Sequence, residues 1–287
     1  MVDVVLVTDK NYFNYALTTI QSLLRNTKSE VLVTCIVTDV EIKDVIRAKE
    51  FFKNKIEIMG YDASSLQHIK TKNHISVAAY IKVLLPQIFS EKEKIIFLDS
   101  DILVREDIAK IWDEFSDDYI IQAVWDPDYS YDNKVLGLSE NDETFNSGVM
   151  LMNLQRMREV YITEKLLEFI EKKNHLTKLN DQAAFNGVFA HSWGRLDLKW
   201  NVQYHLYWTQ ARALKMDQEE KRELLNNPSI LHFTTHSKPW MFRNAHPFKN
   251  EFKEIFNEVN GKIQYDDISL KSMLQRIKED KKIKKFM

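Results

Sequence analysis

Lys94-Ile95-Ile96-Phe97-Leu98 is a short apolar run that leads directly into Asp99-Ser100-Asp101. Its length and β-branched content predict a buried strand. Similar runs predict three earlier strands, at Val2–Thr8, Val31–Val37 and Lys55–Met59. Longer patterns of helical period lie between them, at Tyr12–Arg25, Ile42–Phe52 and Ser76–Ile88. Apolar strands that alternate with helices predict an α/β fold whose mixed, mostly parallel, Rossmann-like central sheet carries helices on both faces.

The second half of the chain is less regular. Its patterns predict two more strands, two helices and one late strand, at Tyr119–Trp125, Val149–Asn153, Gln155–Lys172, Asp181–Phe189 and Ile230–Phe233. The chain holds only 6 Gly and 5 Pro, and no linker is visible. We therefore expect one large domain over residues 1–260 and a small C-terminal helical extension over residues 261–287.

Composition narrows the class of protein. A chain of 287 residues with 44% hydrophobic and 29% charged residues is typical of a globular protein with a real core. The net charge of −2 gives no basic excess for binding nucleic acid. The single cysteine, Cys35, excludes a disulfide framework and favours a reducing compartment. The sequence shows neither a signal peptide nor an apolar run of membrane-spanning length, so we expect a cytoplasmic protein.

The two carboxylates after the predicted strand suggest a cation site. Residues two apart on an extended chain point to the same side, where Asp99 and Asp101 would repel each other unless a cation lay between them. Oxygen ligands suit Mg²⁺ or Mn²⁺. As an alternative, the two aspartates solvate a loop. A phosphatase of the haloacid dehalogenase type would also place Asp-x-Asp after a strand, but there the motif follows the first strand and Thr or Val stands where this chain has Leu103.

A second polar segment runs late in the chain, from His232 to Trp240. His232 ends a strand-like run, and a neutral imidazole is a common third ligand beside two carboxylates. Lys238 follows six residues later and offers a mobile positive charge for a phosphate. The alternative is a surface loop with a satisfied histidine.

Six segments together resemble glycosyltransferase family 8, the retaining enzymes that include glycogenin and bacterial lipopolysaccharide galactosyl- and glucosyltransferases. The resemblance covers about residues 2–250 and implies a GT-A type fold that binds a nucleotide sugar. The segments occur in family order: Val7 to Tyr12, Ile75 to Lys82, Phe97 to Asp101, Phe145 to Val149, Asn180 to Gln182, and His232 to Trp240.

The resemblance implies roles for individual residues. Those that contact the nucleotide sugar are Thr8, Asp9, Asn11, Tyr12, Lys82, Asp99, Ser100, Asp101 and Lys238. Those that bind Mn²⁺ or Mg²⁺ are Asp99, Asp101 and His232. Those around the donor sugar and the reaction centre, assigned to catalysis, are Asp126, Asn146, Asp181 and Gln182.

Three positions depart from the family pattern. Lys82 stands where the family usually has arginine, and lysine lacks the planar fork of the guanidinium. Ala183 follows Asp181-Gln182 where bacterial relatives often have a second aspartate. Thr235 stands near a position that is commonly glycine. These changes bear on donor specificity more than on class.

The resemblance also implies a reaction. The enzyme would transfer a hexose, glucose or galactose, from a UDP-sugar to a glycan, glycolipid or glycoprotein, with retention of anomeric configuration. Gln182 is a poor nucleophile, which favours same-face attack by the acceptor over a covalent intermediate. Besides the phosphatase, a non-catalytic module that binds nucleotide sugar is an alternative.

Two further features concern the acceptor side. Aromatic residues that would stack on an acceptor sugar, or else pack in the core, are Trp193, Trp200, Tyr204, Tyr207, Trp208 and Trp240. The segment from Lys271 to Met287 holds seven Lys/Arg and two acidic residues, interspersed with apolar ones. Such a basic amphipathic tail predicts peripheral binding to the anionic inner face of the cell membrane. The alternative is a solvated, partly disordered terminus.

Overall fold

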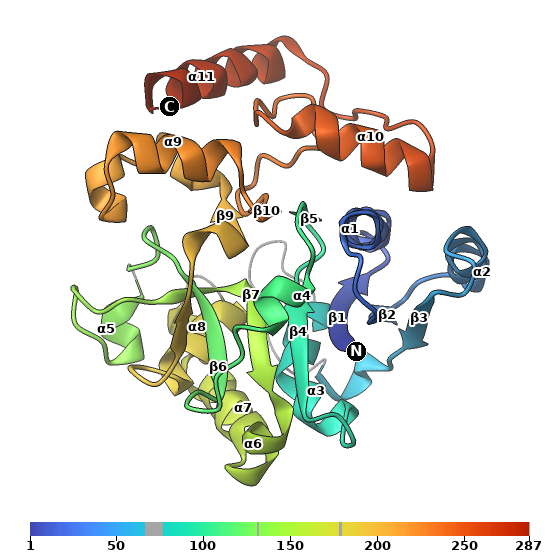
Figure 1. Cartoon of the computed structure of the whole chain (residues 1–287), viewed down its shortest axis with the longest axis vertical. Coiled ribbons are helices and arrows are strands. Elements are labelled where there is room, and N and C mark those ends of the chain that lie inside the picture. Colours follow the sequence, from blue (N-terminus) through green and yellow to red (C-terminus); the bar gives the residue numbers. More distant parts are fainter. Residues whose placement is uncertain (67–76, 131, 178–179, 287) are drawn as a thin grey trace. The chain divides into compact units, whose positions relative to one another are not determined.

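The computed structural model describes residues 1–66, 77–130, 132–177 and 180–286 (Figure 1). Three residues of predicted features lie outside these ranges. Ile75 belongs to a quoted motif, Ser76 to that motif and to a predicted helix, and Met287 to the basic tail. The chain forms two compact units. The first comprises Met1–Phe13, Ser29–Asp99 and Ala109–Asp197, and the second comprises Asn14–Lys28, Ser100–Ile108 and Leu198–Met287. The predicted division at residue 260 stays a prediction.

The first unit contains a seven-stranded sheet in the order β3-β2-β1-β4-β7-β6-β8. Its strands are β1 (Val2–Asp9), β2 (Val31–Thr38), β3 (Ile56–Gly60), β4 (Lys94–Leu98), β6 (Ile121–Trp125), β7 (Phe145–Asn153) and β8 (Gly194–Leu196). Only β7 among them runs antiparallel to its neighbours, β4 and β6. The prediction of a mixed, mostly parallel sheet is therefore confirmed.

Helices pack around this sheet. They are α2 (Ile42–Phe51), α3 (Ile81–Ile88), α4 (Ala109–Trp112), α5 (Asn133–Leu136), α6 (Leu154–Glu159), α7 (Ile162–Lys173) and α8 (Asn180–Val188), with 3-10 turns at Ala63–Leu66, Val77–Tyr80 and Asn174–Leu176. Leu85 of α3, Leu166 of α7 and Phe185 of α8 share one core with Phe97 and Met150 of the sheet. This burial of apolar surface fixes α3 and α8, which carry predicted site residues, against the strands.

Two predicted boundaries are wrong. The helix expected over Gln155–Lys172 is interrupted between α6 and α7, where Tyr161 has a left-handed backbone (φ 56) that no α-helix accommodates. Strand β7 begins at Phe145, four residues before the predicted Val149. This part of the strand was not predicted because it contains Asn146 and Ser147, and polar residues are uncommon in a fully buried strand.

The start of β7 also carries an irregularity. Ala123 of β6 pairs with Met150, yet the next residue, Val124, pairs with Asn146. Three residues of β7 therefore have no partner on β6, while Val149 still pairs with Leu98 of β4. Such a bulge re-aims the side chains beside it, here those of Asn146 and Ser147.

The second unit contains a three-stranded sheet in the order β5-β10-β9. Its elements are α1 (Phe13–Asn26), β5 (Ile102–Val104), η4 (Leu198–Asn201), β9 (Val202–Gln203), η5 (Tyr204–Trp208), η6 (Ala211–Leu214), α9 (Gln218–Asn226), β10 (Ile230–His232), α10 (Lys249–Asn260) and α11 (Leu270–Phe286). Strand β5 is antiparallel to β10 and pairs Ile102 with His232. The sheet thus brings the segment after Asp99 next to the late polar segment that begins at His232.

Helix α1 satisfies the open edge of β5 with side chains. The Thr19 hydroxyl lies 2.8 Å from the Ile102 carbonyl oxygen and accepts from the Ile102 N–H at 3.2 Å. The Ser22 hydroxyl accepts from the Val104 N–H, and the Asn26 amide donates to the Val104 carbonyl, both at 2.9 Å. Polar residues thus replace a neighbouring strand, since buried backbone groups need partners.

The aromatic residues divide between core and partly exposed positions. Trp200, Tyr204 and Tyr207 are fully buried, so they do not form an acceptor platform. The two tyrosines belong to the core of the second unit. Trp240 is partly buried and stacks on Tyr15, with ring centroids 3.6 Å apart. Trp193 and Trp208 are also partly buried.

His246 lies in the same core, with its ring centroid 4.5 Å from that of Tyr204. Nδ1 accepts from the Phe248 N–H at 3.1 Å, so the neutral ring carries its proton on the buried Nε2. Burial lowers the pKa of His246 from 6.5 to about 3.

We expect this histidine to make folding sensitive to acid. Below its ordinary pKa, the unfolded chain takes up a proton that the folded chain refuses. Stability should therefore be full above pH 6.5 and fall by about 1.4 kcal/mol per pH unit as the pH drops toward 3. Urea unfolding at pH 7 and pH 5 measures the loss. The His246→Gln variant should show a flatter dependence, and an unchanged slope would assign the effect to other groups.

The C-terminal segment is helical rather than disordered. Helix α11 is held to the second unit by the buried Ile283 and by Glu279, whose carboxylate accepts from the Tyr204 hydroxyl at 2.9 Å and the Ala245 N–H at 3.0 Å. Within the described residues, no helix has both the length and the apolar character that a membrane span requires.

Candidate active site

The polar residues of the first unit gather at one edge of its sheet. Strands β1, β4 and β6 all end there, because β1 is parallel to β4, and β7 is antiparallel to both β4 and β6. The antiparallel β7 begins there. Asp9, Asp99 and Asp126 end or follow the three strands, and Asn146 begins β7. Ligands of open α/β sheets bind at the carboxyl ends of the strands.

A buried lysine joins several of these residues. Lys82, at the start of α3, is 3% exposed, and its Nζ lies 2.6 Å from Oδ2 of Asp181 and 3.4 Å from Oδ1 of Asp99. Ser147 Oγ lies 3.4 Å from the same Nζ and 3.2 Å from Asp181. Burial alone would lower the pKa of Lys82, but the carboxylates of Asp181 and Asp99 raise it above its ordinary value. Lys82 is therefore a fixed positive charge between two carboxylates.

Gln182 is held at both ends of its side chain. Its Oε1 accepts from the Asn146 amide at 3.0 Å and from the Ser147 N–H at 3.3 Å. Its Nε2 donates to Oδ2 of Asp126 at 3.2 Å. All four residues are buried. The amide of Gln182 thus has one defined orientation, with its carbonyl toward β7 and its N–H toward the end of β6.

Asn186 fixes α8 to β7. It stands four residues after Gln182 on the same face of the helix. Its Oδ1 accepts from the Phe145 N–H, and its Nδ2 donates to the Phe145 carbonyl, both at 2.8 Å. Because Asp181 and Gln182 lie in the first turn of α8, this clamp positions both.

The second unit contains a separate cluster around Asp101. Oδ1 of Asp101 lies 3.2 Å from Nε2 of His232, and Oδ2 lies 2.5 Å from Nζ of Lys238. The Phe233 N–H donates to the Asp101 carbonyl at 3.0 Å, which ties the backbones together. Burial opposes ionisation of Asp101, but Lys238 and His232 hold its pKa well below the usual range. Asp101 is therefore an anion with positive charge already gathered around it.

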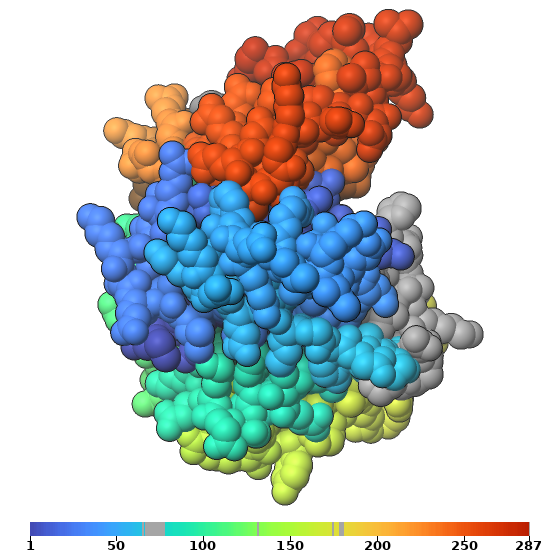
Figure 2. Space-filling model, turned by 90° about the vertical axis from the view of Figure 1, so that its right-hand side faces the viewer, coloured from blue at the N-terminus to red at the C-terminus, as the bar shows by residue number. Residues whose placement is uncertain are grey.

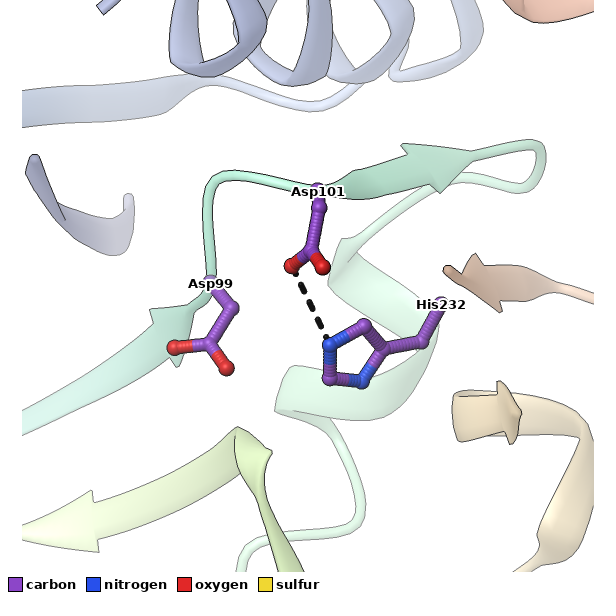
Figure 3. Close-up of side chains that lie close together, drawn as sticks. All are labelled: Asp99, Asp101 and His232. Carbon is purple, nitrogen blue, oxygen red and sulfur yellow. Dashed lines mark ion pairs between the residues drawn. The ribbon is translucent and has the colours of Figure 1, made fainter. Parts of the chain in front are cut away.

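His232 is oriented by Asn201. The His232 Nδ1 lies 3.0 Å from Oδ1 of Asn201, an acceptor, so Nδ1 carries the proton. The other ring nitrogen, Nε2, faces Oδ1 of Asp101 at 3.2 Å (Figure 3) and is the atom that would bind a cation held by this carboxylate. Metal-binding histidines are characteristically fixed in this way by a hydrogen bond to the other ring nitrogen.

Asp99 joins this cluster through the chain itself. Only Ser100 separates it from Asp101, and the backbone bends at Ser100 and Asp101. One ligand atom from each of Asp99, Asp101 and His232 lies within 4.8 Å of the other two (Figure 3). Two carboxylates and an imidazole match the preferences of Mn²⁺ and Mg²⁺ for oxygen with an added nitrogen. Ser100 itself is buried, and its carbonyl accepts from Thr19 at 3.0 Å.

The residues after β1 form a local turn. Oδ1 of Asp9 accepts from the N–H groups of Asn11 and Tyr12, at 2.9 and 3.1 Å, just before α1. Thr8 is buried, with its hydroxyl 3.3 Å from the Asp9 carbonyl, while Asn11 is exposed. Asp9 thus closes the turn that leads into α1, and its role toward a nucleoside stays a prediction.

Thr235 keeps the Lys238 loop compact without glycine. Its hydroxyl accepts from the Ser237 N–H at 3.2 Å, and the Ser237 carbonyl accepts from the Asn244 amide at 2.6 Å. Thr235 has no left-handed backbone, so a side chain is sterically acceptable there.

Three positioning residues escaped the sequence analysis. Two of them could have been found in the sequence. Ser147 lies inside a quoted motif, and Asn186 stands four residues after Gln182, on the same face of a predicted helix. Asn201 left no such signal, because it lies 31 residues before His232 and meets it only through the pairing of β9 with β10.

Comparison with known proteins identifies the family. Residues 3–243 match the model of glycosyl transferase family 8. General stress protein A of Bacillus subtilis (strain 168) is 30% identical over 85% of this chain and 89% of its own length. Lipopolysaccharide 1,2-glucosyltransferase of Escherichia coli is 26% identical over 87% of this chain and 76% of its own. The chain spans 56% of glycosyltransferase GlyF of Streptococcus pneumoniae, to which it is 29% identical.

A solved structure agrees on the fold. The galactosyltransferase LgtC, in complex with donor and acceptor sugar analogs, has a TM-score of 0.79 with this chain and is 19% identical to it. The match covers 95% of this chain and 99% of LgtC, which confirms the GT-A type fold. The phosphatase alternative is left without support. Since the family model covers most of the chain, the protein is a member of glycosyltransferase family 8.

Proposed function

We propose that this glycosyltransferase moves a hexose, glucose or galactose, from a UDP-sugar to a glycan, glycolipid or glycoprotein acceptor, with retention of configuration. The observation that carries the proposal is the cluster of Asp99, Asp101 and His232 with Lys238 beside it. The named activities of the Escherichia coli relative and of LgtC, a glucosyltransferase and a galactosyltransferase, support a hexose.

The cluster fits a divalent cation, Mn²⁺ or Mg²⁺. Asp99 and Asp101 supply hard oxygen ligands, and Nε2 of His232, which lies 3.2 Å from Oδ1 of Asp101, supplies the third. A bound ion would supply positive charge to offset that of the departing UDP. In this structure Nζ of Lys238 lies 2.5 Å from Oδ2 of Asp101 and balances the charge of that carboxylate. We propose that Lys238 turns from Asp101 to the diphosphate when donor binds, as a flexible point charge can.

The rest of the donor is assigned to residues at the edge of the first sheet. We propose that Asp9 and Asn11, with Thr8 and Tyr12, bind the uridine. Ser100 lies between the two ligand aspartates in the sequence, and we propose that it contacts the diphosphate. Lys82 holds Asp99 and Asp181 in position and adds positive charge near the sugar.

Gln182 is proposed to stabilise the positive charge that develops on the donor sugar. A covalent route needs a free carboxylate, whereas Asp181 is bound to Lys82 at 2.6 Å and Asp126 is bound to Gln182 at 3.2 Å. We therefore favour same-face attack, in which the acceptor hydroxyl adds as UDP leaves and the leaving phosphate takes its proton. The Gln182 amide, held by Asn146 on one side and Asp126 on the other, is a fixed dipole that needs no reorganisation.

Replacement of Gln182 by Ala is expected to lower kcat about 100-fold or more, the typical cost of one preorganised dipole. Donor KM should change little, because this interaction grows only as charge develops. The measurement is steady-state UDP release with the preferred donor. The control is Gln122→Ala, which removes a buried glutamine of the same unit whose side chain bonds Ser116 and Glu114, away from the proposed site. Full turnover in Gln182→Ala would remove Gln182 from the reaction.

Asn201→Leu is expected to weaken Mn²⁺ binding 10- to 100-fold, in the range of lost second-layer partners, because Nδ1 of His232 loses its acceptor. Isothermal titration with Mn²⁺ measures this. Asn227→Leu, at an exposed C-terminal position of α9, serves as the control. Unchanged affinity in Asn201→Leu would show that His232 does not bind the metal.

The experiment that tests the function is UDP release from a panel of UDP-sugars, with Mn²⁺ or with EDTA. Release with one hexose donor that EDTA abolishes would support the proposal and name the sugar. Binding of a UDP-sugar without release in the presence of acceptors would favour the non-catalytic module. Failure to bind any UDP-sugar would overturn the proposal.

A further inference from the structure

We propose that α11 is a docking surface for an anionic phospholipid bilayer, with an apolar stripe that enters the lipid interface and a lysine row that binds the phosphates. The proposal concerns where the enzyme works. It does not depend on the sugar chemistry proposed above.

The apolar stripe lies on the exposed side of α11. Leu270, Met273, Leu274 and Ile277 follow the spacing i, i+3, i+4, i+7, which places them on one face of a helix. They are 81, 49, 60 and 45% exposed, respectively. The opposite face is the one that packs on the second unit, through Ser272, Glu279 and Ile283. A contiguous apolar stripe in solvent marks an interaction surface.

The lysine row flanks the stripe. Lys271, Lys278, Lys282 and Lys285 lie at i, i+7, i+11 and i+14, on one side of the helix, and all are exposed. The two acids of α11 are engaged elsewhere. Glu279 accepts from Tyr204 and Ala245, and Asp280 pairs with Lys284 at 2.7 Å. Both carboxylates keep their negative charge, but residues 271–286 hold seven Lys/Arg against these two acids, so the helix stays strongly positive.

A cavity of about 220 Å³ opens beside the lysine row, within the second unit. Its lining includes Lys278 and Lys282 together with His236 and Arg243, and Glu279 is its one acidic lining residue. Nε of Arg243 is buried without a hydrogen-bond partner among the described residues. Phosphate oxygens are the acceptors that such guanidinium and ammonium groups bind best.

These features together select a bilayer over other occupants. The first two turns of α11 combine exposed Leu, Met and Ile residues with a lysine flank, and lysines continue along the rest of the helix. Such a short apolar patch with many lysines suits binding at the surface of a membrane interface. Charge complementarity selects anionic lipids, since clustered lysines are attracted to them and hardly at all to neutral lipids. The C-terminal segment, red in Figure 2, lies at the molecular surface, as docking requires.

The test is co-sedimentation of the full chain with vesicles. Vesicles of phosphatidylglycerol and phosphatidylethanolamine should bind the protein at least about 10-fold more tightly than phosphatidylcholine vesicles. The variants Leu274→Ser/Ile277→Ser and Lys278→Gln/Lys282→Gln should each lose about 10-fold in affinity. The matched control is Ile42→Ser/Ile46→Ser on α2, whose isoleucines are 78 and 51% exposed. The neighbouring cations there, Lys43 and Arg47, are paired with Glu41 and Asp44. It should bind like the unaltered protein.

Three results would overturn the proposal. The first is absence of binding to the anionic vesicles. The second is equal binding by the unaltered protein and both α11 variants, or an equal loss in the α2 control. The third is release by inorganic phosphate at constant ionic strength, which would indicate a site for soluble phosphate alone. Thermal unfolding of each variant verifies folding, and UDP release from soluble donors separates failure of docking from failure of the proposed function.

Discussion

Asp101→Asn is expected to lower UDP release by about 1000-fold or more, equivalent to about 4 kcal/mol in transition-state stabilisation. The substitution preserves the shape of the side chain but removes the anion that faces both Nε2 of His232 and Nζ of Lys238. Without it, the proposed cation loses a charged ligand. Lys238 and the cation were balanced by this carboxylate, so the positive charges in the cluster would also repel each other.

The measurement is UDP release with the preferred donor, together with calorimetric titration of Mn²⁺. Asp217→Asn is the matched control, since Asp217 caps α9 in the same unit and has no proposed role in donor binding. The control should keep nearly full activity. Retention of more than a tenth of the activity in Asp101→Asn would mean that the cluster does not act on the donor.

Lys82→Met is expected to destabilise the first unit by about 3–5 kcal/mol, the usual cost of removing one partner from a buried ion pair. Methionine fills the space of the lysine stem, but Asp181 loses an ammonium at 2.6 Å and Asp99 loses one at 3.4 Å. Both carboxylates would then lie close together with no positive charge between them. Urea unfolding with EDTA present, so that no cation compensates, measures the change.

Two companion variants make this prediction specific. Lys82→Met/Asp181→Asn should recover part of the lost stability, because the unpaired carboxylate is gone. Lys82→Arg restores the residue common in the family, keeps the charge, and should lose less than half as much as Lys82→Met. Equal stability of Lys82→Met and the unaltered protein would show that the buried pair contributes nothing to folding.

The fold was largely predictable because its strands are apolar throughout. Lys94–Leu98 was predicted without error, and the order of strands and helices indicated the parallel sheet. The start of β7 was missed because Asn146 and Ser147 serve the site and therefore break the strand pattern. The break at Tyr161 was missed because no glycine or proline announces it. Local rules fail where tertiary contacts or site chemistry override them.

The candidate site was predictable as a set of residues, and their contacts were not. Asp99 and Asp101 were paired on the argument of an extended chain, whereas the backbone bends at Ser100 and brings their oxygens together in another way. Lys82 was predicted to contact the nucleotide sugar, and nothing in the sequence indicates that it lies between Asp99 and Asp181. Such contacts depend on which strand ends meet, which is a property of topology.

The side-chain ladder between α1 and β5 limits how this chain can change length. A helix rises about 1.5 Å per residue and a strand about 3.3 Å, so Thr19, Ser22 and Asn26 match Ile102 and Val104 only at their present spacing. One residue inserted between Thr19 and Asn26 would rotate the helix by about 100° and leave buried backbone groups of β5 without partners. Functional homologues should therefore tolerate insertions in surface turns, such as the one at residues 215–216 before α9, but none within this helix. Where an alignment needs a gap there, the register of Asp101 is the first thing to doubt.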